Sequence, residues 1–264
     1  MVDSSEATLQ QLVAALAGLP GVAAITLGGS TAAGLADESS DLDVYVYYHE
    51  PLAASADRAA RLRSLADEGT LEVGILTFGL EDHLYIQQKL VELVYLDLDR
   101  LIAEADRAYS QGLSSEGYTT SLLYILFRSQ VFHDATGEVT ALRARLNAAY
   151  PEPTRTRLLR AHPELLRYYL ELLRVSQQRD DLLYVQQLRY NIQAIFFNLL
   201  FALNRQYHPG GKRLLPHAQR CAIQPPDLAA RWNHVARLSA DDRALADLLE
   251  ALIDDLCWLI ETNE

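Results

Sequence analysis

Residues 27–48 read LGGSTAAGLADESSDLDVYVYY, and this stretch decides the fold of the first part of the chain. Two apolar runs, 22–27 and 42–48, are short and rich in Val, Ile and Tyr, as is typical of strands. Small and polar residues fill 28–40 between them. The pattern therefore predicts a strand, a loop and a second strand.

Two acids open the second predicted strand, Asp41 and Asp43. Residues two apart on a strand point to the same face, so the two carboxylates are expected side by side at the strand end. Adjacent carboxylates repel, and a hard divalent cation with oxygen ligands removes the repulsion. We expect Asp41 and Asp43 to bind Mg²⁺.

The first predicted strand ends in Gly28, Gly29 and Ser30. Glycines leave no side chain between the backbone amides and a bound phosphate, and a serine hydroxyl donates a hydrogen bond to it. We expect this turn to bind a phosphate group.

The stretch resembles the signature of the DNA polymerase beta-like nucleotidyltransferase superfamily. It contains Gly29-Ser30, a glycine at position 34, and the acidic pair preceded by serine in Ser40-Asp41-Leu42-Asp43. The resemblance implies a Mg²⁺-dependent enzyme that uses ATP or another nucleoside triphosphate. One departure is Thr31-Ala32-Ala33, where many compact members carry an arginine, so the triphosphate charge must be met elsewhere.

Members of the superfamily need a third carboxylate from a neighbouring strand. Glu92 is the one acid inside the apolar run 90–96, and the resemblance assigns it to metal binding or to deprotonating the acceptor hydroxyl. A solvated position or a pair with an arginine is the alternative role for Glu92. Glu72 is the competing candidate, whereas Asp97 and Asp99 follow the strand and are typical of surface or helix-cap residues.

Lys212 is the candidate cation for the triphosphate, with a plain surface position as the alternative. It follows Pro209-Gly210-Gly211 after a long predicted helix, and Lys89 is the only other lysine of the chain. The turn resembles the helical tail of small-molecule nucleotidyltransferases, in which a lysine faces the nucleotide. Surface or packing roles are expected for four neighbours, Asn204, Arg205, His208 and Arg213.

Composition limits the class of protein. The chain has 264 residues, 50% of them hydrophobic, and a net charge of -12. Residues 1–110 carry 6 basic and 18 acidic side chains, and residues 155–220 carry 11 basic and 4 acidic ones. Nucleic acid binding relies on many basic contacts, so a nucleic acid partner is not expected. Without an apolar span or signal pattern, we expect a cytoplasmic protein that does not bind membranes; the two cysteines are expected to be reduced.

The pattern along the chain predicts an α+β fold. Residues 1–105 are expected to form an α/β nucleotidyltransferase catalytic domain with a mixed sheet, and residues 106–264 a helical bundle domain. The active site is expected in the cleft between them. Strands are predicted over 22–27, 42–48, 71–78 and 90–96, with 84–89 as a possible partner; the clearest helices are 7–17, 55–68, 119–132, 163–176, 182–204 and 240–260.

The expected activity is transfer of AMP from ATP to a hydroxyl of a small molecule, by resemblance to lincosamide and aminoglycoside nucleotidyltransferases. Two alternatives stay open at this stage. One is a nucleotidyltransferase that adenylylates a partner protein, similar to compact antitoxins. The other is a non-catalytic nucleotide-binding module. The sequence leaves the oligomeric state open.

Overall fold

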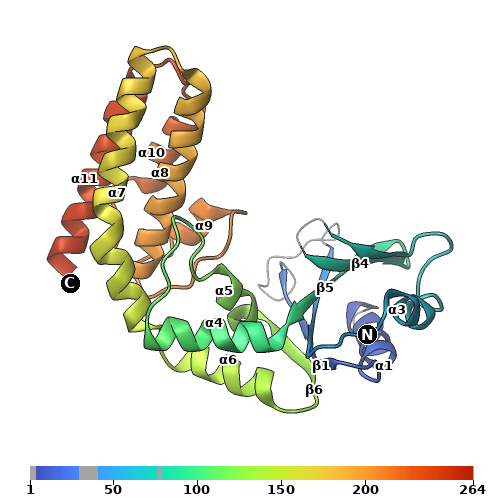
Figure 1. Ribbon diagram of the computed structural model, residues 1–264. Helices are drawn as coiled ribbons and strands as arrows, with labels where there is room; N and C mark the ends of the chain where they lie inside the picture. The colour runs from blue at the N-terminus through green and yellow to red at the C-terminus, as the bar shows by residue number, and fades with distance from the viewer. Residues whose placement is uncertain (1–3, 30–40, 77–78, 264) are drawn as a thin grey trace. The chain divides into compact units, whose positions relative to one another are not determined.

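The chain folds as an α+β protein built on one mixed sheet, followed by a set of helices (Figure 1). The computed structural model describes residues 4–29, 41–76 and 79–263. The six strands lie in the order β3-β4-β5-β2-β1-β6. Only the pairing of β2 with β5 is parallel; the other four pairings are antiparallel. The described elements are α1 Ser4–Leu16, β1 Val22–Leu27, β2 Leu42–Tyr48, α3 Ser55–Leu62, β3 Glu72–Ile75, β4 Leu80–Ile86, β5 Lys89–Asp97, α4 Leu98–Ser110, α5 Ser121–Arg128, β6 Gln130–Asp134, α6 Glu138–Ala148, α7 Glu152–Gln178, α8 Leu182–Leu203, α9 Leu214–Ala218, α10 Leu228–Arg237 and α11 Ala244–Asn263.

One face of the sheet is covered by α1 and α3, which lie on the same side of the strands in Figure 1. Alternate residues of β2 and β5, such as Val44, Val46, Val91 and Leu93, point to this face, and Asp43 and Glu92 point to the other. The resulting core contains Leu9, Leu12, Leu16, Leu62, Val44, Val46, Val91 and Leu93. The polar side chains of β2 and β5 therefore point away from these two helices.

A buried ion pair lies within this core. Arg58 of α3 is 3% exposed and Asp82 of β4 is not exposed at all. The guanidinium donates two hydrogen bonds to the carboxylate, at 2.8 and 2.9 Å. The Tyr95 hydroxyl and the Gly74 amide donate to the same carboxylate. Because every partner is hydrogen bonded, the pair joins α3 to three strands without leaving an uncompensated buried charge.

The sixth strand is a correction to the prediction of a helix over 119–132. Helix α5 ends at Arg128, and β6 pairs with the outer side of β1. The segment 130–134 forms a strand because it pairs with β1, which is distant in sequence. Local periodicity does not reveal such a pairing. The predicted helix 163–176 is also longer than expected: α7 begins at Glu152 and continues through Pro163.

Two compact units divide the chain. The first comprises residues 1–105 and 125–149, and the second comprises residues 106–124 and 150–264. The first unit thus consists of two segments, and the second of them, residues 125–149, contains β6. In the second unit, α7, α8, α10 and α11 pack around a core that includes Leu166, Leu173, Ile192, Phe196, Leu249 and Ile253. Both cysteines are free and buried there.

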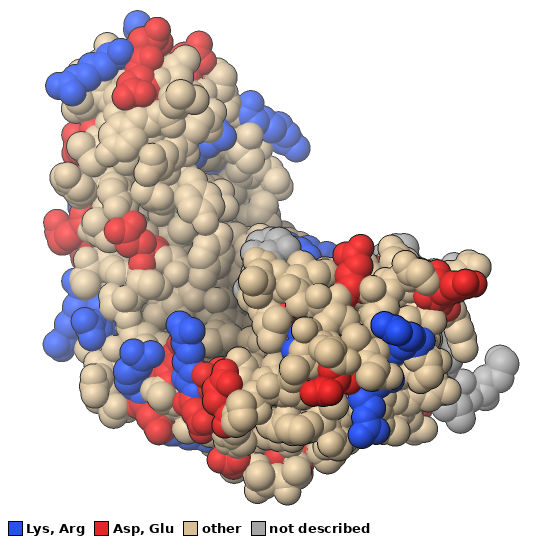
Figure 2. Space-filling view, turned by 45° about the vertical axis from the view of Figure 1, so that its right-hand side comes forward, with Lys and Arg blue, Asp and Glu red and all other residues tan. Residues whose placement is uncertain are grey.

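Charged side chains of both signs occur on the face shown in Figure 2. Among the described residues of that face, Lys and Arg are interspersed with Asp and Glu and form no continuous basic band. No helix in the described part of the chain is both long and apolar enough to cross a membrane.

Candidate active site

The candidate site begins with two acids on neighbouring strands. Asp43 of β2 and Glu92 of β5 are direct partners in the parallel register. Both are partly exposed, and both alternate with fully buried apolar residues of the α1/α3 core. Their side chains therefore point to the same face of the sheet, opposite the α1/α3 core, on adjacent strands.

Two glycines approach this face closely. Gly29 has a φ of +63°, and a methyl group added to it would overlap the carboxylate of Asp43. A methyl group on Gly28 would overlap the ring of Tyr45 in the same way. The Gly28 amide also donates a hydrogen bond of 2.9 Å to the Asp43 carbonyl. The glycines are thus required where the chain passes directly against the Asp43 carboxylate.

The pKa of Tyr45 is affected by the negative charge of this site. Burial raises the pKa of the Tyr45 phenol well above its usual range, and the negative charge of Asp43 raises this pKa further. Tyr47 and Glu92 add smaller contributions in the same direction. The carboxylates of Asp43 and Glu92 thus act on a common point between β2 and β5.

A metal ion would need further ligands beyond these acids. Asp41 is exposed immediately before β2. Across the described residues, no three acidic, histidine or cysteine side chains converge closely enough to hold a metal ion on their own. The donor set nevertheless fits Mg²⁺, because this ion is commonly held by one or two carboxylates, with phosphate and water oxygens completing its shell. Ser30, Gly34 and Ser40 lie outside the described residues.

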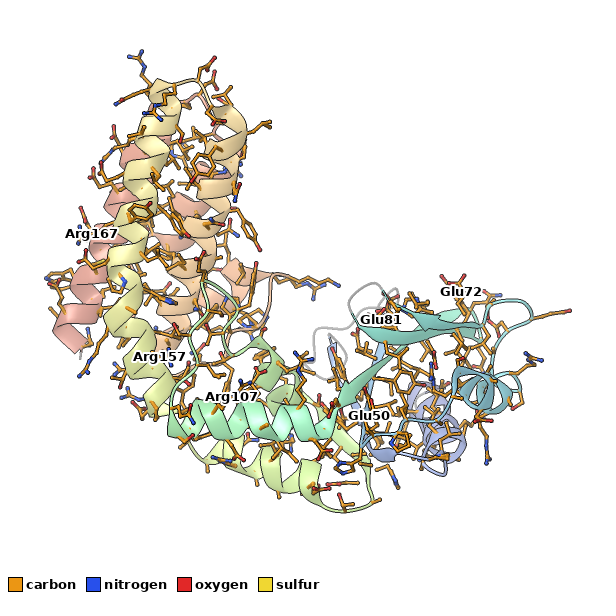
Figure 3. The ribbon with its side chains drawn as sticks, viewed as in Figure 1. Glu50, Glu72, Glu81, Arg107, Arg157 and Arg167 are labelled. Carbon is orange, nitrogen blue, oxygen red and sulfur yellow. The ribbon has the colours of Figure 1, made fainter. Side chains whose placement is uncertain are left out.

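The two candidates for the third carboxylate occupy different strands. Glu92 lies beside Asp43, whereas Glu72 lies on β3, with β4 and β5 between it and β2. Figure 3 labels Glu72 on this outer part of the sheet. The register thus favours Glu92 over Glu72 by proximity. Asp97 accepts a hydrogen bond from the Arg100 amide at the start of α4, which confirms its expected capping position.

Two polar residues of β4 escaped the sequence analysis. His83 is the direct cross-strand partner of Glu92, and its Nε2 lies 3.1 Å from Oε2 of Glu81 and 4.0 Å from Oε1 of Glu92. Glu81, labelled in Figure 3, is only 6% exposed. The predicted strand began at residue 84, after both of them. The feature that could have indicated them is the spacing of Glu81 and His83, two residues apart, directly before the apolar residues 84–86.

Lys212 lies in the second unit, exposed in the turn before α9. His208, which is 1% exposed, contacts this turn: its Nδ1 accepts a hydrogen bond from the Gly210 amide. Burial lowers the pKa of this histidine to about 4, so it stays neutral and serves packing as expected. Asn204 bridges to Ile223, and Arg205 pairs with Glu152, in agreement with the surface and packing roles expected for both.

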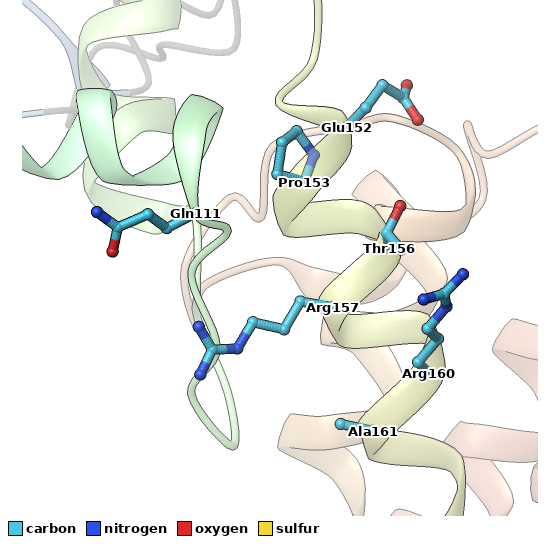
Figure 4. Close-up of a pocket in the computed structure, with 7 residues that line it drawn as sticks. All are labelled: Gln111, Glu152, Pro153, Thr156, Arg157, Arg160 and Ala161. Carbon is cyan, nitrogen blue, oxygen red and sulfur yellow. The ribbon is translucent and has the colours of Figure 1, made fainter.

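A cavity of about 710 Å³ also belongs to the second unit (Figure 4). It is lined by Gln111 and by the first turns of α7, including Glu152, Arg157 and Arg160. Arg157 extends toward the segment after α4, where it donates to the Gly112 carbonyl, whereas Arg160 lies on the other side of α7 in Figure 4. The arginines do not converge, so this cavity is not a second candidate site.

Comparison with known families gives two matches along the chain. Residues 9–104 match the family described as "Nucleotidyltransferase domain", and residues 117–214 match "Domain of unknown function (DUF4037)". The first match lies over most of the sheet, the second lies over residues that follow it, and neither covers half of the chain.

Among solved structures, the chain is similar to a nucleotidyltransferase-like protein from Exiguobacterium sibiricum 255-15. The two share 14% sequence identity with a TM-score of 0.48, over 98% of this chain and 75% of that one. Comparison with curated proteins found no match.

Proposed function

We propose that this protein is a Mg²⁺-dependent enzyme that transfers AMP from ATP to a hydroxyl group of a small molecule. The observation that carries the proposal is the direct pairing of Asp43 with Glu92, with Gly29 held against the Asp43 carboxylate. The family match over residues 9–104 supports the same class of reaction.

In the proposed reaction, the acceptor oxygen forms a bond to the α-phosphorus of ATP while the bond from that phosphorus to the pyrophosphate oxygen breaks. Pyrophosphate leaves, and the hydroxyl proton passes to a base of the site. Asp41 and Asp43 would hold Mg²⁺, and Glu92 is the candidate either for a third ligand or for the base; the ion would neutralise charge that develops on the attacking and leaving oxygens.

Charge elsewhere on the chain supports two further parts of the proposal. Lys212 is exposed, and we propose that its ammonium group contacts the triphosphate. The net charge of -12 and the acids Glu72, Glu81 and Glu92 on neighbouring strands favour a small acceptor that carries positive charge. Hydroxylated antibiotics with amino groups, as used by lincosamide and aminoglycoside nucleotidyltransferases, have this chemistry.

The direct test is pyrophosphate release from MgATP in the presence of a panel of aminoglycosides, lincosamides, amino sugars and simple alcohols. We expect release with at least one cationic acceptor, with a mass increase of that acceptor equal to one AMP residue. The Asp41→Asn/Asp43→Asn double variant is the matched control and should release none. Wild-type protein that releases no pyrophosphate with any acceptor would contradict the small-molecule proposal.

A further inference from the structure

The carboxylate of Glu92 has a neighbour on each side. Asp43 lies on β2, and His83 lies on β4 directly opposite Glu92 in the antiparallel register. The Nε2 atom of His83 is 4.0 Å from Oε1 of Glu92. Glu92 is one third exposed, and a glutamate side chain with that freedom has several rotamers unless a neighbour restrains it.

His83 is itself anchored. Its Nε2 is 3.1 Å from Oε2 of Glu81, and Glu81 has a side chain only 8% exposed. The Nε2–H tautomer of His83 places a donor on this contact, and a carboxylate oxygen of Glu81 accepts from it. The almost complete burial of Glu81 fixes one end of this contact, and the contact fixes the imidazole ring that faces Glu92.

We infer that Glu81 and His83 are positioning residues that hold the Glu92 carboxylate beside Asp43. The inference rests on the proposed function, in which Glu92 takes part in nucleotidyl transfer. Glu81 orients His83, and the Nε2 edge of His83 restricts Glu92 to rotamers on the Asp43 side. Such supporting contacts around metal-site carboxylates and bases commonly change affinity or rate about 10- to 100-fold when removed.

A set of four variants tests this role. His83→Leu removes the polar edge that faces Glu92, whereas His83→Gln keeps an N–H donor close to the position of Nε2. Glu81→Leu removes the anchor, and Glu92→Gln removes the group that is positioned. For each, the dissociation constant of MgATP is measured by calorimetry, and the rate of transfer of labelled AMP from ATP to the acceptors of the panel is measured together with pyrophosphate release.

Glu92→Gln is expected to weaken either MgATP binding or the transfer rate. We expect His83→Leu and Glu81→Leu each to weaken that same property by about 10-fold. His83→Gln should restore most of the loss. In the metal-free wild-type protein, NMR of the imidazole nitrogens should show the Nε2–H tautomer of His83, and Glu81→Leu should change that signal. This last readout does not depend on activity or on a bound metal.

The inference is overturned if Glu92→Gln has an effect that His83→Leu lacks, if His83→Gln is as impaired as His83→Leu, or if Glu92→Gln has no effect. An unchanged imidazole signal in Glu81→Leu also overturns it. Failure of the proposed function looks different: wild-type protein would not bind MgATP, or binding would be unaffected in Asp43→Asn. Circular dichroism separates loss of function from loss of folding in each variant.

Discussion

Asp43 and Glu92 are direct partners in the one parallel strand pair of the described sheet. Their side chains therefore extend from adjacent strands to the same face of the sheet. Their parallel register aligns the two acids, and the glycine turn after β1 passes against the first of them. This relationship connects residues 49 positions apart in sequence.

The first prediction separates the two candidates for the third carboxylate. Glu92→Gln should lower nucleotidyl transfer by roughly 100-fold or more, because it removes either a metal ligand or the base. Glu72→Gln, on the outer strand β3, should lower it by less than about threefold. Pyrophosphate release measures both. An equal loss in the two variants would mean that Glu92 has no special role.

Gly29 supplies a second prediction, which concerns space at the site. Gly29→Ala should abolish MgATP binding because the added methyl group would displace the Asp43 carboxylate. Gly69→Ala is the matched control: Gly69 also has positive φ, +76°, but nothing lies within 4 Å of the added carbon. It should cost only about 1–2 kcal/mol of stability and leave binding intact. If Gly29→Ala bound MgATP normally, the close approach of Gly29 to the Asp43 carboxylate would not matter for binding.

The buried ion pair of Arg58 with Asp82 gives a stability prediction. Asp82→Ala leaves the buried guanidinium without its partner and should destabilise the first unit by roughly 3–5 kcal/mol. Asp254→Ala breaks a pair whose side chains are 48% and 55% exposed and should cost less than about 1 kcal/mol. Hydrogen exchange of the β4 and β5 amides measures the first effect. Unchanged protection there in Asp82→Ala would be inconsistent with the observed network.

His49 provides a prediction of pH dependence. Hydrogen bonds to Asp99 and then Glu138 raise the pKa of this histidine in the folded protein. Protonation therefore favours the folded state, and the contribution is complete below the unfolded pKa of about 6.5. It is lost as the pH rises through the raised folded value. The free energy of unfolding of wild type minus that of His49→Gln should thus be largest below about pH 6.5 and fall as the pH rises above it.

Comparison with His49→Gln is needed because other histidines act in the opposite direction. Burial lowers the pKa of His208 to about 4, so its contribution to stability is lost as the pH falls below about 6.5. Both proteins contain His208, and its contribution cancels in the difference. A difference that does not change with pH would show that the contacts of His49 do not persist in solution.

Several parts of the fold followed from local pattern. Val22–Leu27, Leu42–Tyr48 and Leu182–Leu203 form the predicted elements almost to the residue, because short β-branched runs and a long apolar period each favour one structure. Strand β6 did not follow, since Gln130–Asp134 has no local break from α5 and gains its structure from pairing with β1.

The candidate site was predictable in its motif but not in its surroundings. Asp41, Asp43 and the glycines carry a spacing that sequence alone reveals, and the acid within an apolar run marked Glu92. Glu81 and His83 were missed because a run of Glu-Asp-His does not resemble a strand. Asp82 lies between them and is fully buried, which only its distant partner Arg58 explains.

We propose that Asp43 helps to hold the metal-bound nucleotide. Calorimetric titration of ATP into the protein, with and without Mg²⁺, compares the wild type with Asp43→Asn. We expect Mg²⁺-dependent binding to the wild type that Asp43→Asn loses while it remains folded. Binding that survives in Asp43→Asn, or a wild type that binds no nucleoside triphosphate, would contradict it.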